Sequence, residues 1–152
     1  MNSDTLLKNK INSIIELYSN GNIQKSLEAV EASIIEHPEE SLLQNIRGVL
    51  YKATGHLEIA AKSFNKAVKI KPDFADAHYN LGLTLQELNQ FDDAIKSYEM
   101  ALNIQSNYAK AHNNLGTIYK EIRQIDQAIQ SFEKALKIEP DFAEAHNNLG
   151  NA

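Results

Sequence analysis

The fold is decided by the stretch HYNLGLTLQELNQFDDAIKSYEMAL, residues 78–102, and by its near-copy HNNLGTIYKEIRQIDQAIQSFEKALKIEP, residues 112–140. The two segments correspond place for place when His78 is aligned with His112. The same interval separates the glycines Gly48, Gly82, Gly116 and Gly150. A constant period of about 20–50 residues is typical of solenoids and other repeat arrays. The sequence therefore predicts a chain of stacked repeats.

Each repeat is expected to contain two amphipathic helices. In the third repeat, Leu81, Leu85 and Leu88 have the i, i+4, i+7 spacing of one helical face, and the segment 95–102 continues the pattern. Between the two halves of a repeat, the chain has residues expected to take the left-handed conformation that ends a helix: Gly21, Gly55 and Asn89, with Arg123 there at some conformational cost. One hairpin cannot bury its apolar face alone, so neighbouring hairpins must stack.

These residues resemble the tetratricopeptide repeat family, whose unit is about 34 residues long, over residues 7–152. The resemblance implies an all-α fold, a right-handed α-α solenoid (superhelix) of helix-turn-helix repeats, forming a single domain over 1–152. The repeats are expected at 7–40, 41–74, 75–108 and 109–142, with a half repeat at 143–152. The first repeat is degenerate, because Ser13 and Ile14 occupy the places of Leu and Gly.

Composition narrows the class of function. The 152 residues include no cysteine, which excludes disulfides, a thiol nucleophile and a cysteine zinc site. The formal net charge of −5 disfavours nucleic-acid binding, which usually needs a basic surface. No apolar run approaches the length of about 20 residues needed to cross a membrane. We expect a cytoplasmic protein without a cofactor, and no catalytic motif suggests an enzyme.

The most specific candidate site is a series of asparagines. Asn80, Asn114 and Asn148 recur at the interval of the glycines, each directly before Leu-Gly. They resemble the asparagine ladder of O-linked N-acetylglucosamine transferase repeats, in which side-chain amides pair with the backbone of an extended peptide. A carboxamide suits this role because it both donates and accepts hydrogen bonds. The alternative is that these asparagines bond a neighbouring helix or the preceding loop, and Asn113 and Asn147 could serve either purpose.

The resemblance also implies that the first helices of the repeats line a concave groove. Of the further residues expected there, we select Asn45, Tyr79, Lys110 and Lys120 for peptide binding. A carboxylate clamp like that of chaperone-binding repeats is disfavoured, because only Asn80 and Lys110 match it. His78, His112 and His146 also recur once per repeat, and they are interpreted as packing residues. Side chains on parallel helices about 8–10 Å apart cannot converge on one metal ion, so no metal site is expected.

The predicted function is that of a non-catalytic scaffold that binds a protein or an extended peptide in its groove. The alternative is the substrate-recruiting arm of a larger enzyme, such as a glycosyltransferase, of which residues 1–152 would be an excerpt. A third hypothesis is a homo-oligomer formed through the open helix at 143–152. The sequence does not identify the partner.

Overall fold

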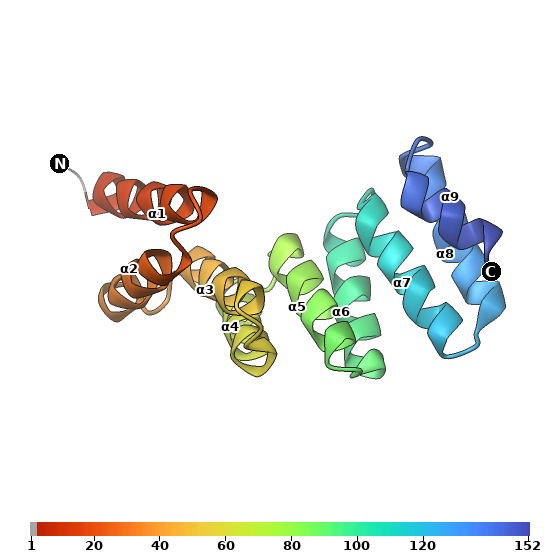
Figure 1. Cartoon of the computed structure of the whole chain (residues 1–152), viewed down its shortest axis with the longest axis horizontal. Helices are drawn as coiled ribbons and strands as arrows, with labels where there is room; N and C mark the ends of the chain where they lie inside the picture. The colour runs from red at the N-terminus through yellow and green to blue at the C-terminus, as the bar shows by residue number, and fades with distance from the viewer. Residues whose placement is uncertain (1–2) are drawn as a thin grey trace. The chain divides into compact units, whose positions relative to one another are not determined.

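The computed structural model describes residues 3–152, and this range contains nine α-helices and no strand (Figure 1). The all-α fold of helical hairpins predicted from the repeats is therefore confirmed. Contacts divide the chain into two compact units, one ending at Pro72 and the other spanning Asp73–Ala152. That they form a single domain stays a prediction. None of the described helices combines the length and apolar character needed to cross a membrane.

The first unit contains two hairpins. Its helices are α1 (Ser3–Ser19), α2 (Ile23–Glu36), α3 (Ser41–Ala53) and α4 (Leu57–Ile70). Helix α1 begins four places before the expected start of the repeat at residue 7, so the degenerate repeat has the longest first helix of the described residues.

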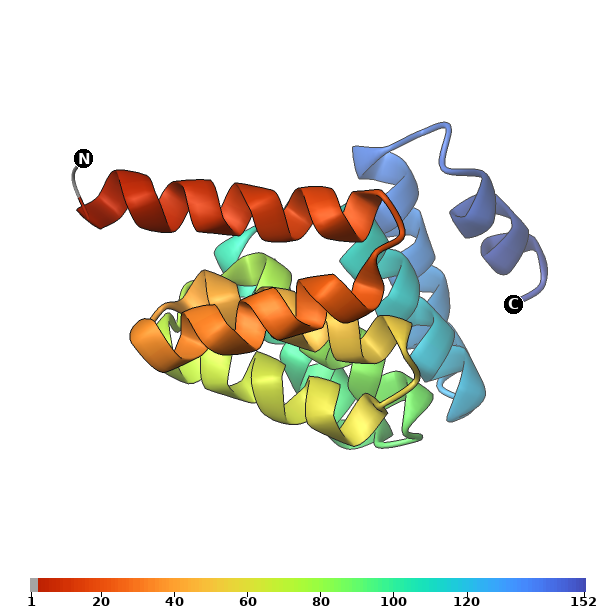
Figure 2. The same ribbon diagram turned by 60° about the vertical axis from the view of Figure 1, so that its left-hand side comes forward.

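The second unit contains two hairpins and one further helix. Its helices are α5 (Ala75–Glu87), α6 (Phe91–Ile104), α7 (Ala109–Glu121), α8 (Ile125–Ile138) and α9 (Ala143–Gly150). Both views show the two members of each hairpin lying side by side (Figure 1, Figure 2). The turn residues have positive φ as predicted: 76° at Gly21, 79° at Gly55, 58° at Asn89 and 62° at Arg123.

The glycine in the first helix of a hairpin lies against an aromatic ring of the second. A Cβ atom on Gly82 would lie 2.7 Å from a ring carbon of Tyr98, and one on Gly116 would lie 2.7 Å from a ring carbon of Phe132. Gly48 of the first unit has the same relation to its own ring, that of Phe64. The absence of a side chain is what allows these helices to approach each other so closely.

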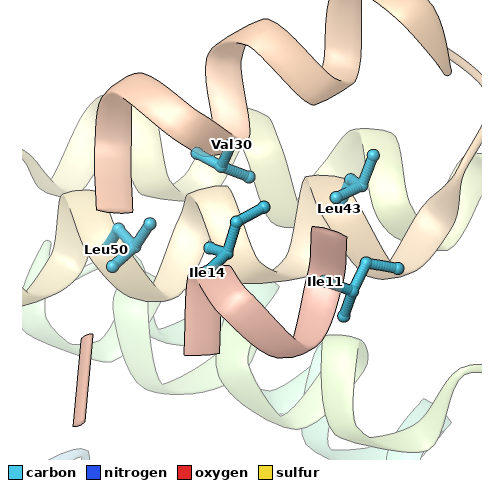
Figure 3. Packing of buried hydrophobic residues seen from close by; sticks show 5 residues of the cluster. All are labelled: Ile11, Ile14, Val30, Leu43 and Leu50. Atoms are coloured by element: carbon cyan, nitrogen blue, oxygen red, sulfur yellow. The ribbon is translucent and has the colours of Figure 1, made fainter. Parts of the chain in front are cut away.

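In the first hairpin, the corresponding contact between the two helices has the larger residue in the first helix and the smaller residue in the second. Ile14 occupies the glycine place and Val30 occupies the aromatic place, and both are essentially fully buried. They form one apolar cluster with Ile11, Leu43 and Leu50, to which α1, α2 and α3 all contribute (Figure 3). A larger residue in the first helix thus compensates for a smaller one in the second, which is how cores tolerate substitution when total volume is kept.

Candidate functional site

In the second unit, the first helices of successive repeats carry a connected set of polar side chains. We call the surface formed by Tyr79 on α5, Asn114 on α7 and Asn148 on α9 the amide face. The Nδ2 atom of Asn114 donates to Tyr79 Oη at 3.2 Å. The Nδ2 atom of Asn148 donates to Asn113 Oδ1 at 3.0 Å. Hydrogen bonds therefore join α5 to α7 and α7 to α9, and they hold the carboxamides in defined orientations.

Asn113 is the buried centre of this network. Its side chain is 0% exposed, and its Nδ2 atom donates to Glu144 Oε1 at 2.9 Å while its Oδ1 atom accepts from Asn148. Both ends of the carboxamide thus bond the neighbouring helix α9. Of the two roles left open for Asn113, these contacts correspond to bonding a neighbouring helix, whereas Asn114 and Asn148 remain partly exposed.

Tyr79 is held by aromatic packing. Its ring stacks on that of Tyr108, with centroids 4.7 Å apart and planes inclined by 29°, and lies 5.8 Å from that of Tyr98. Tyr108 Oη donates to Asp76 Oδ1 at 3.2 Å. Burial raises the pKa of Tyr79 above its usual range, so the hydroxyl that accepts from Asn114 stays neutral.

Tyr108 was not among the predicted site residues. It ends the third repeat, at the place where the second and fourth repeats have Phe74 and Phe142. Tyr108 differs from these phenylalanines by its hydroxyl group. That hydroxyl bonds Asp76, which lies on α5, 32 residues earlier in the chain.

The remaining predicted residues lie on α3, α5, α7 and α9. Asn80 is partly exposed on α5, Lys110 is exposed at the start of α7, and Lys120 is partly exposed near the end of that helix. Asn147 is exposed on α9 and accepts a bond from Asn151 at 3.2 Å. Asn45 is buried on α3, in the first unit. Peptide binding by these residues stays a prediction.

Two of the recurring histidines, His112 and His146, contact the loops that precede their helices. His112 Nε2 lies 3.2 Å from the carbonyl oxygen of Ser106, and His146 Nε2 lies 2.7 Å from that of Pro140. A ring N–H at this position satisfies a carbonyl group at the end of the preceding repeat. Among residues 3–152, no cluster of three histidine, aspartate or glutamate side chains could hold a metal ion.

Comparison with known proteins shows which protein family these repeats resemble. A family model described as "Tetratricopeptide repeat" matches residues 73–140, and a second, described as "TPR repeat", matches residues 48–89. The chain is 30% identical over 67 residues to a peroxisomal targeting signal receptor of Candida albicans, a match that covers 44% of this chain and 11% of the receptor. The chain therefore spans about a tenth of the length of that relative.

Solved structures show the same fold over nearly the whole chain. The crystal structure of MamA matches with a TM-score of 0.85 and 25% identity, over 90% of this chain and 80% of that one. A chain in the crystal structure of the APC/C hetero-tetramer Cut9-Hcn1 matches with a TM-score of 0.84 and 23% identity, over 93% of this chain and 29% of that one.

Proposed function

This chain is built from tetratricopeptide repeats, and on that premise we propose that it is a non-catalytic scaffold that binds an extended segment of a partner protein along the amide face. The name of the similar Candida albicans protein, a targeting signal receptor, supports a binding role. The expected concave groove and the asparagine ladder belong to this proposal.

The observation that carries the proposal is the geometry of Asn114 and Asn148. Each carboxamide donates an N–H to Tyr79 or Asn113, and Asn114 Oδ1 also accepts from Asn113 Nδ2 at 3.5 Å. A carboxamide oxygen has two lone pairs, and both side chains are partly exposed, so each keeps at least one acceptor position for a ligand. Successive packed helices lie about 8–10 Å apart. This matches three residues of an extended chain, which rises about 3.3 Å per residue. One amide per repeat can therefore pair with every third peptide unit.

Backbone pairing of this kind would be tolerant of sequence, so a random-sequence library can supply ligands. Peptides selected from such a library on the wild-type chain are synthesised, and their affinities are measured by fluorescence anisotropy. We expect the pair Asn114→Ala and Asn148→Ala to weaken binding by about tenfold or more, which corresponds to the loss of about 1.4 kcal/mol. Asn103→Ala is the matched control, because Asn103 is an exposed asparagine on α6 and belongs neither to the amide face nor to the predicted site residues. Unchanged affinity in the double variant would refute the proposal.

A second candidate role uses the same surface. The resemblance of the asparagine ladder to that of the glycosyltransferase repeats favours a substrate-recruiting arm within a larger enzyme. The mass of the endogenous protein, measured intact, distinguishes the two roles. A mass equal to that of residues 1–152 leaves only the free-standing scaffold, whereas a larger mass requires that the additional segment be tested for glycosyl transfer.

A further inference from the structure

The first unit has a hollow between α1 and the start of α3 that, unlike the polar amide face, is lined largely by aliphatic side chains. Its volume is about 440 Å³, and its apolar lining consists of Leu7, Ile11, Ile15 and Leu42. Pockets that bind small molecules and cofactors commonly have volumes of about 300–1,000 Å³. We call this hollow the α1 groove. It shares no residue with the amide face, so its role is independent of the function proposed above.

The apolar lining forms a continuous line along one side of α1. Leu7, Ile11 and Ile15 are spaced by four residues, and at about 1.5 Å per residue the line is about 12 Å long. Such an i±4 row is the ridge against which another helix packs. Ile15 is 45% exposed and Leu42 is 37% exposed, so large aliphatic surface remains in contact with solvent. An amphipathic helix lying in an apolar groove is an established mode of recognition.

The rim of the groove is mostly acidic. Asp4 and Glu40 lie on it with a single cation, Lys8. Glu39 lines an adjoining hollow that shares Leu7 and Glu40 with the groove. Three carboxylates against one ammonium group favour a ligand with cationic flanks, both in its association rate and in its choice of orientation.

A second copy of this chain is disfavoured as the ligand of an acidic rim, because its formal net charge is −5. The helix richest in lysine in the described part of the chain is α4, with Lys62, Lys66 and Lys69. Its apolar residues Phe64 and Ala67 are 0% exposed, because they pack within their own hairpin. The other apolar residues near its lysines, such as Ile59 and Val68, are only partly exposed, so α4 offers no fully exposed apolar row.

We infer that the α1 groove is a docking site for a basic amphipathic helix of a partner protein, with aliphatic side chains against Leu7, Ile11, Ile15 and Leu42 and with Lys or Arg beside Asp4 and Glu39. The groove accommodates about three helical turns of such a ligand, judged from the 11-residue span between Asp4 and Ile15.

The test uses a labelled synthetic peptide with Leu at i, i+3, i+4 and i+7 and Lys at the other places. Its binding to the full chain is measured by fluorescence anisotropy, beside a peptide of the same composition in scrambled order and one with Glu in place of Lys. We expect the amphipathic Lys peptide to bind at least about tenfold more tightly than either control.

Variants of the chain show where the Lys peptide binds. Ile15→Asn with Leu42→Asn removes exposed aliphatic surface without adding charge, and we expect it to weaken the Lys peptide by about tenfold or more. Ile35→Asn is the matched control, because Ile35 is 83% exposed on α2 and does not line the groove. Asp4→Asn with Glu39→Gln should weaken binding by a few-fold and reduce its dependence on salt. Glu40 is left intact because its carboxylate accepts from the backbone N–H of Leu42 at the start of α3.

Three outcomes would overturn the inference. Equal binding of the scrambled peptide would show only attraction between a cationic peptide and an acidic protein. Retention of affinity in the Ile15→Asn/Leu42→Asn variant would place the peptide elsewhere. Light scattering that shows a wild-type dimer, dissociated by the same double variant, would assign the groove to a second copy.

Discussion

In the first unit, α1 and α3 present Leu7, Ile15 and Leu42 to the same hollow, whereas in the second unit α5 and α7 are joined through a hydrogen bond between Tyr79 and Asn114. Both surfaces are formed by first helices of repeats with the same period. The α1 groove is an aliphatic row with charges at its rim, and the amide face is linked by directional bonds from helix to helix.

From this difference it follows that the repeat fixes the backbone and leaves the chemistry of the surface open. Apolar packing is non-directional and depends on volume and area, so the first unit could exchange the sizes of Ile14 and Val30 without losing its core. A buried amide such as Asn113 requires specific partners, so the second unit depends on the identity of residues in neighbouring helices. Four changes test this contrast.

The largest effect on the free energy of unfolding is expected at Ile14 and Val30, the pair whose sizes are exchanged relative to the other hairpins. Ile14→Gly should destabilise the protein by about 4 kcal/mol, through a cavity beside Val30 and the low helix propensity of glycine. Adding Val30→Phe restores the arrangement of the other hairpins and should recover about half of that loss or more. Urea unfolding of both single variants and of the double variant gives the coupling free energy. Strict additivity would contradict the exchange of volumes.

A smaller effect is expected at the glycines of the second unit. A Cβ on Gly116 meets Phe132 at 2.7 Å, so Gly116→Ala should cost about 2 kcal/mol. Gly150→Ala is the matched change, because nothing lies within 4 Å of a Cβ there. Since alanine favours helix over glycine by about 1 kcal/mol, Gly150→Ala should be neutral or slightly stabilising. Thermal unfolding compares the two, and equal losses would show that close approach to the ring is not the cause.

The amide network should give the next effect. Asn113→Ala removes the bonds to Glu144 and Asn148, and we expect a loss of about 1.5 kcal/mol in the free energy of unfolding. Asn147→Ala, at the exposed residue directly before Asn148 on α9, should change the free energy of unfolding by less than about 0.5 kcal/mol. Hydrogen exchange of the α9 amides reports where the loss acts. If α9 keeps its protection in Asn113→Ala, the network does not hold that helix in place.

The smallest effect is a pH dependence in the second unit. Burial lowers the pKa of His112 below 6.5, and nearby Lys134 lowers it further although the Ser106 carbonyl opposes the shift. The unfolded chain therefore takes up a proton at higher pH than the folded one. The stability associated with the neutral ring is present above pH 6.5 and is lost as the pH falls toward the lower folded pKa.

The check on His112 is the slope of unfolding free energy against pH. His112→Gln keeps an N–H donor for the loop carbonyl and removes the titration, so its slope below pH 6.5 should be shallower than that of the wild type. Parallel curves would show that His112 makes no contribution to the acid sensitivity of the protein.

Much of the fold was predictable because repetition makes local signals redundant. The repeat interval located the first helices that begin at Ser41, Ala75, Ala109 and Ala143, and the turn residues had the positive φ expected of them. The start of α1 at Ser3 could not be counted in this way, since the degenerate repeat offers few aligned residues. Of the candidate site, the series of Asn114 and Asn148 was visible as a spacing, but the burial of Asn113 was not.

The period and the helical hairpins could be read from the amino-acid sequence, because each follows from spacing along one chain. Three other features required the folded structure: which asparagine is buried, the support of Tyr79 by Tyr108, and the apolar groove with an acidic rim between α1 and α3. Those features depend on contacts between residues of different helices. Neighbouring places within a repeat, such as Asn113 and Asn114, differ by about 100° around the helix axis, and that rotation separates a buried side chain from a partly exposed one.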